Sequence, residues 1–227
     1  MKILFLTDNF PPEVNAPATR TFEHCKEWQD QGVEVTIITC FPNFPKGRVY
    51  EGYKNKLYQV EELHGMKVIR VFTYITANKG IVKRTLDYIS FMIAASIAGL
   101  FVKTDFIVAT SPQFFTALAG RFLSLVKRKS WLLEIRDIWP ESIKVVTGMD
   151  NIAIRFFEFL ERRMYEKADK IVIVTPQLMQ NLIEDHPVVK DKIKVVTNGV
   201  DLSNFDPKLN AIELRVKLGL ENKIVIA

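Results

Sequence analysis

The sequence predicts a doubly wound α/β domain with a mainly parallel sheet and helices on both of its faces. Short runs rich in Ile, Val and Leu alternate along the chain with longer segments that carry apolar residues at helical spacing. The short runs show no clean alternation of polar and apolar residues, which is typical of strands covered on both faces. We therefore expect a Rossmann-like sheet with right-handed crossovers between its parallel strands.

Eight short apolar runs are the expected strands, and the first lies at the N-terminus. The third and fourth runs flank His64-Gly65 and should pair as a hairpin. A further run, Lys223–Ala227, also has the composition of a strand. The eight strands are expected at Lys2–Thr7, Val33–Thr39, Leu57–Leu63, Lys67–Phe72, Phe106–Ala109, Trp131–Ile135, Lys170–Val174 and Lys192–Val196.

The helical segments lie between these runs. Pro17 suits a first helical position, because the first N–H groups of a helix have no partner within it, and Gly32 ends that helix. We expect residues 1–205 to form one Rossmann-like domain, and residues 206–227 to be a linker helix and the first strand of a second domain that is cut off. The helices are expected at Pro17–Gln31, Gly80–Val102, Pro112–Lys127, Ile152–Lys167, Pro176–Glu184 and Leu209–Leu218.

The composition is that of a globular protein with an anionic partner. The chain has 227 residues, 48% of them hydrophobic, and a net charge of +5. Nucleic acid, acidic lipid and a phosphorylated substrate all fit this charge. Cys25 and Cys40 lie on expected core elements without metal-ligand spacing, which indicates reduced thiols that act as small hydrophobic residues. The first apolar run is too short for a secretory signal.

The segment Ile89–Val102 carries no charge and has two interpretations. A helix buried against the sheet is the simpler one, and a helix resting in a membrane interface is the alternative. A membrane-spanning helix needs about 20 apolar residues, so this run is too short to cross a bilayer. Lys83, Arg84 and Lys103 flank it and could contact anionic headgroups.

The loop after the first strand contains no glycine. A dinucleotide-binding fingerprint needs glycines so that the backbone can approach a pyrophosphate, so this loop is no site for NAD or FAD. Its side chains Asp8, Asn9, Glu13 and Asn15 suit sugar hydroxyls instead. The alternative is that Asp8 and Asn15 cap the first helix while the prolines stiffen the turn.

The loop after Trp131–Ile135 concentrates charged and aromatic residues at one strand end. Arg136, Asp137, Trp139 and Glu141 could form an anion and sugar site, with the guanidinium on a phosphate or carboxylate and the indole on a sugar face. The alternative is a structural pair of Arg136 with Asp137 under a packed Trp139, because charges at such an end must be paired.

Two further loops bring small hydroxyls to helix N-termini. Ser111 and Thr175 could bind an anion there or could simply cap their helices. Other chemistries lack their motifs: the three histidines have no metal-ligand spacing, and neither a nucleophile elbow nor a P-loop is present. The short basic stretch Lys127–Lys129 ends a helix, which favours a solvated cap over nucleic-acid contact.

At these loops the sequence resembles the family 4 glycosyltransferases, which have the two-domain GT-B architecture. The markers are KILFLTDNFPPEVNAPATR at Lys2–Arg20, RDIWPES at Arg136–Ser142, the stretch from Ala168 to Pro176, and TNGVDLSNF at Thr197–Phe205. The residues of the first two markers resemble those of bacterial enzymes of O-antigen and capsule assembly that add an N-acetyl-L-fucosamine unit.

The resemblance implies a retaining, metal-independent transfer from a UDP-sugar to a polyprenyl-diphosphate-linked acceptor, with no cofactor. We expect catalytic roles for Glu13, Arg136 and Asp137. Arg136 would contact an anionic group or orient Glu13, because the role of the family's His does not transfer to it. The resemblance adds Asn198 and Gly199 to the expected substrate contacts. The residues that hold the donor diphosphate would lie in the second domain, so residues 1–227 alone should be inactive. Many relatives have glycines where this chain has Pro-Pro-Glu, and a His where it has Arg136.

A lipid-linked acceptor also implies a cytoplasmic protein that sits peripherally on the inner membrane. Two rival functions remain open at this stage. One is another Rossmann enzyme, such as a nucleotide-sugar epimerase or dehydrogenase, against which the missing glycine fingerprint counts. The other is a non-catalytic module that binds lipid or a protein partner.

Overall fold

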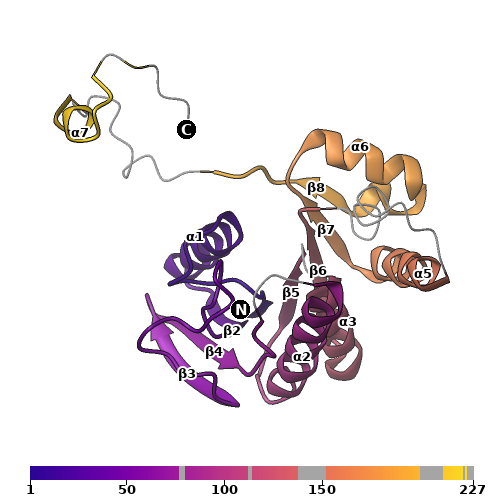
Figure 1. Ribbon diagram of the computed structural model, residues 1–227. Coiled ribbons are helices and arrows are strands. Elements are labelled where there is room, and N and C mark those ends of the chain that lie inside the picture. The colour runs from indigo at the N-terminus through magenta and orange to yellow at the C-terminus, as the bar shows by residue number, and fades with distance from the viewer. Residues whose placement is uncertain (77–79, 112–113, 138–151, 200–211, 222, 224–227) are drawn as a thin grey trace. The chain divides into compact units, whose positions relative to one another are not determined.

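The chain consists of two compact units, Met1–Thr197 and Asn198–Ala227, which are described separately. The computed structural model describes residues 1–76, 80–111, 114–137, 152–199, 212–221 and 223 (Figure 1). In the second unit it contains one short helix, α7 (Ile212–Lys217), none of whose residues is buried. The expected strand at Lys223–Ala227 lies, apart from Lys223, outside the described residues.

The first unit is built on one eight-stranded sheet with the order β3-β4-β2-β1-β5-β6-β7-β8. Every neighbouring pair is parallel except β3 with β4, which form the expected hairpin around His64-Gly65. The predicted doubly wound fold class is therefore confirmed. The strands are β1 (Lys2–Leu6), β2 (Glu34–Cys40), β3 (Tyr58–Leu63), β4 (Met66–Val71), β5 (Phe106–Thr110), β6 (Ser130–Ile135), β7 (Lys170–Ile173) and β8 (Ile193–Val195).

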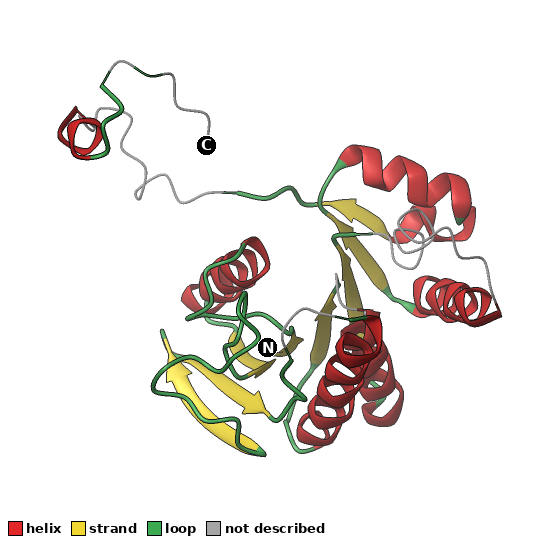
Figure 2. Cartoon of the chain, in the orientation of Figure 1, coloured by secondary structure: helices red, strands yellow, loops and turns green. Residues whose placement is uncertain are grey.

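Helices cover both faces of this sheet (Figure 2). The helix α1 (Ala16–Asp30) packs on one face, where Cys25 meets buried residues of β1, β2 and β4. The helices α2 (Ile81–Leu100), α3 (Phe114–Lys127) and α5 (Ile152–Lys167) contribute to a second core on the other face. The chain of this unit continues through α6 (Pro176–Asp185) and a 3₁₀ helix, η1 (Pro187–Lys192), into β8.

The local sequence explains where several helices begin. Asn15 caps α1, since its Oδ1 accepts a 2.8 Å hydrogen bond from the backbone N–H of Ala18, and Pro17 lies in the first turn. Thr175 caps α6 in the same way, with its Oγ1 accepting from Leu178. The structure thus contains the caps that the sequence offered as one interpretation of Asn15 and Thr175.

The largely apolar helix α2 has one buried face and another face that is exposed to solvent. Phe91, Ala95 and Ala98 face the core, whereas Ile97 is 56% exposed and Phe101, at the C-cap, is 84% exposed. No helix in the described part of the chain is long and apolar enough to span a bilayer. One face of α2 therefore packs on the sheet, as the simpler interpretation predicted, and another presents large apolar side chains to solvent.

Candidate functional site

The carboxyl ends of the parallel strands gather the loops that the sequence marked as candidates. Leu6 of β1 pairs with Ile38 of β2 and with Ala109 of β5, and Ala109 pairs with Leu133 of β6. The loops after these four strands therefore leave the sheet at one edge, where ligands of open α/β sheets bind. We call this edge, with its side chains from the β1, β5 and β6 ends and from α1, the candidate site.

A buried ion pair lies at the centre of this edge. The Nε of Arg20, in α1, donates a 2.8 Å hydrogen bond to Oε1 of Glu134, in β6, and both side chains are 4% exposed. The remaining guanidinium nitrogens of Arg20 donate to the carbonyls of Val196 and Thr197, at 2.9 and 3.0 Å. Arg20 thus ties α1 to the end of β6 and to the segment that leaves β8.

His24 lies one turn after Arg20 and approaches the same carboxylate. Its Nδ1 is 4.0 Å from Oε1 of Glu134. Burial lowers the pKa of His24, the positive charge of Arg20 lowers it further, and Glu134 opposes both. Burial and Arg20 therefore favour the neutral form of His24, whose imidazole can donate or accept a hydrogen bond at this edge.

Arg136 follows β6 directly and is half-buried beside this pair. Its backbone N–H donates a 3.2 Å hydrogen bond to Oγ of Ser111, which joins the ends of β5 and β6. Burial lowers the pKa of Arg136, while the charges of Glu134 and Asp137 raise it. Its Nη1 is buried, and no atom of the described residues accepts a hydrogen bond from it. A buried guanidinium N–H of this kind is suited to an anionic ligand.

Glu13 is buried, and one of its oxygens holds the loop after β2. Oε1 accepts hydrogen bonds from the backbone N–H groups of Asn43, at 2.7 Å, and Phe44, at 2.8 Å. The other oxygen, Oε2, is buried without a hydrogen-bond partner in the described part of the chain. Burial raises the pKa of Glu13, against the two backbone N–H groups, which lower it. The structure thus gives Glu13 a loop-anchoring contact besides the catalytic role proposed for it.

Two polar side chains of the first loop, Asn9 and Asn15, hydrogen-bond to each other. Nδ2 of Asn15 donates to Oδ1 of Asn9 at 2.8 Å, and the backbone N–H of Asn9 donates to Oγ1 of Thr7. The carbonyl of Asp8 accepts from the thiol of Cys40, which connects the loop to the end of β2. This network orders the loop and leaves its side chains at the candidate site.

Asp87, in α2, is a carboxylate at this edge that the sequence did not single out. Burial raises its pKa to about 7, and the nearby charge of Asp8 adds to the increase, whereas Arg84 lowers it. An Asp that titrates near neutral pH can hold or release a proton under physiological conditions. Its position three residues after Arg84 places it in the N-terminal half of α2.

Three of the other expected site residues are exposed. Thr175 is exposed at the start of α6, and Asn198 and Gly199 are exposed in the second unit. Trp139 and Glu141 lie outside the described residues. In the part of the chain that the structure describes, no group of three His, Cys, Asp or Glu side chains could hold a metal ion. The structure therefore brings together Asp8, Asn9, Glu13, Asn15, Ser111, Arg136 and Asp137 from the predicted set.

Two residues of the candidate site that sequence analysis missed, Arg20 and Glu134, had weak signals. Glu134 is a lone charge within the apolar run WLLEI, and Arg20 ends the marker segment Lys2–Arg20. A charge within a buried strand needs a partner, which could have drawn attention to Glu134. Nothing in the sequence joins it to Arg20, 114 residues away.

The comparisons with known proteins agree with this architecture. The family model described as Glycosyltransferase Family 4 matches residues 18–204. A protein of Escherichia coli (strain K12) named as a glycosyl transferase of colanic acid biosynthesis, WcaI, is 24% identical over 237 residues. That match covers 100% of this chain and 58% of WcaI, so the chain spans little more than half of this curated relative.

Solved structures show the same fold. The sucrose-phosphate synthase of Thermosynechococcus elongatus matches with a TM-score of 0.65 at 13% identity, over 96% of this chain and 52% of that one. A glycosyltransferase of Rickettsia africae ESF-5 matches with a TM-score of 0.57 at 16% identity, over 96% and 49%. The calicheamicin glycosyltransferase CalG4 gives 0.58 at 13%, over 92% and 55%. With its family model matched over most of its length and its sheet built like one half of these GT-B structures, the chain belongs to Glycosyltransferase Family 4.

Proposed function

We propose that the protein to which this chain belongs is a glycosyltransferase, and that residues 1–197 are its acceptor-side domain. The observation that carries this proposal is the family match over residues 18–204. The candidate site supports it, because the edge of the sheet offers the half-buried Arg136 with a buried Nη1, and polar side chains in the loop after β1 that suit sugar hydroxyls. In this proposal the nucleotide sugar supplies the anion for Arg136, and a saccharide supplies the hydroxyls for the loop after β1.

The finer proposal concerns donor and acceptor. We infer that the donor is a UDP-sugar, an N-acetylated deoxyhexose, and that the acceptor is a lipid-linked saccharide of O-antigen or capsule synthesis. The name of WcaI, which refers to the biosynthesis of colanic acid, supports such a polysaccharide setting. The transfer retains the anomeric configuration and needs neither a metal ion nor a cofactor. We place the residues that hold the donor diphosphate in the second domain, beyond residue 227, and therefore expect residues 1–227 alone to be inactive.

The acceptor would require the protein to work at the cytoplasmic surface of the inner membrane. The exposed residues Lys83 and Arg84 at the start of α2, and Lys103 after its end, suit anionic headgroups. Phe101, with most of its ring exposed, suits the boundary between headgroups and acyl chains. These features support a peripheral association through α2.

The test is a transfer assay with the whole protein. A panel of UDP-sugars is offered with a polyprenyl-diphosphate-linked saccharide, and products are identified by mass spectrometry. We expect a mass increase with one N-acetylated deoxyhexose, unchanged turnover in EDTA, and no product from residues 1–227. Absence of transfer with every donor would reject the glycosyltransferase. Saturable binding of NAD would instead favour the epimerase or dehydrogenase.

A further inference from the structure

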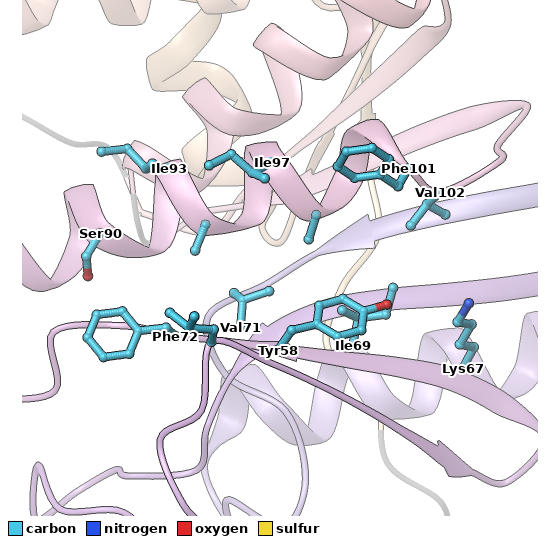
Figure 3. Close-up of a pocket in the computed structure, with 13 residues that line it drawn as sticks. Tyr58, Lys67, Ile69, Val71, Phe72, Ser90, Ile93, Ile97, Phe101 and Val102 are labelled. Carbon is cyan, nitrogen blue, oxygen red and sulfur yellow. The ribbon is translucent and has the colours of Figure 1, made fainter.

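An open apolar groove lies between α2 and the β3–β4 hairpin (Figure 3). Its volume is about 710 Å³, within the range of about 300–1,000 Å³ found for small-molecule sites. Ile93, Ile97 and Phe101 come from the helix side, and Tyr58 and Phe72 from the hairpin side. The full lining is Leu57, Tyr58, Lys67, Ile69, Val71, Phe72, Ser90, Ile93, Ala94, Ile97, Ala98, Phe101 and Val102.

The groove exists because β3 is an edge strand that α2 does not cover. The inner part of the helix packs on β4 through buried residues, while Ile93 and Ile97 remain 51% and 56% exposed. Across from them Tyr58 and Leu57 are exposed as well. Large apolar side chains that are exposed together on two facing elements indicate a binding surface, whereas single exposed apolar residues are normal on any protein surface.

The groove runs along β4 from its carboxyl end, at Val71, toward Lys67 near its start. Phe72 and Ser90 lie at its first end, next to Val71, which pairs with Cys40 at the carboxyl end of β2. The backbone N–H of Tyr74 donates a 2.7 Å hydrogen bond to Oγ of Ser90, which joins hairpin and helix there. Figure 3 shows the row Ser90, Ile93, Ile97 and Phe101 along the helix side.

Two basic residues lie on α2 about two helical turns before the end of the groove at Ser90. Lys83 precedes Ser90 by seven residues, so both lie on one face of α2, and Leu86, 48% exposed, lies between them. Arg84 is exposed beside Lys83. Arg84 donates a 2.8 Å hydrogen bond to the hydroxyl of Tyr88 and also acts on the carboxyl of Asp87, whose pKa it lowers while Asp8 raises it.

We infer that this groove binds one hydrocarbon chain of a phosphate-bearing lipid, with the phosphate beside Lys83 and Arg84. The lining fits a hydrocarbon, because its only charged residue is Lys67, none is acidic, and the hydroxyl of Ser90 is engaged with the backbone. A saccharide would leave its hydroxyls without partners there. The inference rests on the proposed lipid-linked acceptor, and it assigns the place of that acceptor's hydrocarbon.

The test uses residues 1–227 and a C15 isoprenyl phosphate that carries a photoreactive diazirine on its chain. Labelled peptides are mapped by mass spectrometry, and unlabelled isoprenyl phosphate competes. The matched variants are Ile97→Asp, which puts a charge into the groove, and Val126→Asp, at a position on α3 that is 55% exposed and does not line it. A second groove variant, Ala94→Phe, fills the groove without adding a charge.

We expect saturable labelling of α2 and the hairpin that falls at least about tenfold in Ile97→Asp and Ala94→Phe and is unchanged in Val126→Asp. Lys83→Ala combined with Arg84→Ala should remove the preference for the phosphate over the neutral prenol. Labelling that does not saturate, that maps elsewhere, or that falls equally in Val126→Asp would overturn the inference. So would a dimer that binds no lipid and becomes monomeric in Ile97→Asp, since the groove would then join two copies.

The outcome is separable from that of the proposed function, because the labelling needs no donor sugar. Lipid in the groove without transfer by the whole protein would retain the inference and reject the glycosyltransferase. Suppose instead that the whole protein transfers sugar and that Ile97→Asp and Ala94→Phe leave the KM for the lipid acceptor unchanged. That result would retain the glycosyltransferase and overturn the inference about the groove.

Discussion

Arg20 and Glu134 form a buried ion pair, 2.8 Å long, between α1 and β6. Both side chains are 4% exposed, and Arg20 also donates to two carbonyls at the end of the first unit. The pair thus connects the first helix, the sixth strand and the segment that leaves β8. Because it lies beside Arg136, it also sets the electrostatic surroundings of the candidate site.

Removing the acid of this pair should cost stability. We expect Glu134→Ala to lower the free energy of unfolding by about 3–5 kcal/mol, because Arg20 is left as a buried charge without its carboxylate. The control is Glu34→Ala, whose partner Lys2 lies 2.5 Å away in an exposed pair that is worth at most about 1 kcal/mol. Urea unfolding of both variants measures the difference, and equal small losses would contradict the prediction.

Asp87 should make stability depend on pH. The folded chain keeps its proton up to about pH 7, because burial and Asp8 raise the pKa, whereas the unfolded chain releases it near 3.8. The folded state therefore binds more protons between these values, so the contribution is full below pH 3.8 and is lost as pH rises through 7. We expect Asp87→Asn to be more stable than the wild type at pH 8, by about 1 kcal/mol once solvent screening is allowed for.

Urea unfolding at pH 5 and pH 8 checks this, with the exposed Asp191→Asn as control. The advantage of Asp87→Asn should shrink at the lower pH, and an advantage of the same size at both pH values would count against the shifted pKa.

Arg136 should matter for turnover in the whole protein. A guanidinium bound to an anionic ligand contributes on the order of 1.5–3 kcal/mol, so we expect Arg136→Ala to lower kcat/KM at least about tenfold. The control is Arg121→Ala, which removes a partly buried arginine of α3 outside the candidate site and should leave the rate unchanged. Steady-state kinetics with a UDP-sugar donor decides, together with unfolding curves that correct for lost stability. A near-normal rate would show that Arg136 has only a structural role.

Glu13 can be tested with two variants that separate its loop contact from its charge. Glu13→Ala removes the acceptor of two backbone N–H groups and should cost about 1–3 kcal/mol of stability, whereas Glu13→Gln keeps an acceptor oxygen. We expect both variants to lower turnover, since a catalytic role needs the carboxylate. Thermal unfolding and kinetics are measured on the same samples. Normal turnover in Glu13→Gln would limit Glu13 to holding the loop.

Two glycines should respond differently to alanine. A Cβ at Gly120 would lie 2.5 Å from Cβ of Ala109, which is fixed to β5, whereas a Cβ at Gly99 would meet the methyl ends of the Leu123 side chain. Since Leu123 can adjust and a strand cannot, we expect Gly120→Ala to cost about 1–3 kcal/mol and Gly99→Ala clearly less. Urea unfolding of the two variants compares them, and the reverse order would show that α3 shifts freely on the sheet.

Much of the secondary structure followed from local patterns. The Ile- and Val-rich runs became strands within one or two residues of their expected bounds, and Ile152–Lys167 is a helix with both ends as predicted. Asn15 and Thr175 cap their helices, which the sequence offered as an alternative to substrate contact. Caps and periodicity act over a few residues, so they can be interpreted without knowing the fold.

The candidate site was predictable only in part. Its edge was expected, because ligands of parallel sheets bind beyond the strand ends, and Arg136 was singled out there. Glu134 and Asp87 were missed, since one lies within an apolar strand and the other within an apolar helix. The anchoring of Asn43 and Phe44 by Glu13 was missed as well, because it joins two separate loops.

The sequence by itself determined the alternation of strands and helices and the helix starts, since these depend on neighbouring residues. Tertiary structure decided which distant side chains meet. The strand order places β1 between β2 and β5, and this brings Arg20 to Glu134 and Asp87 near Asp8. It also left β3 as an uncovered edge, so that the apolar face of α2 lines a groove instead of a closed core. Packing between remote segments has no local signature, because its energy comes from contacts that exist only after folding.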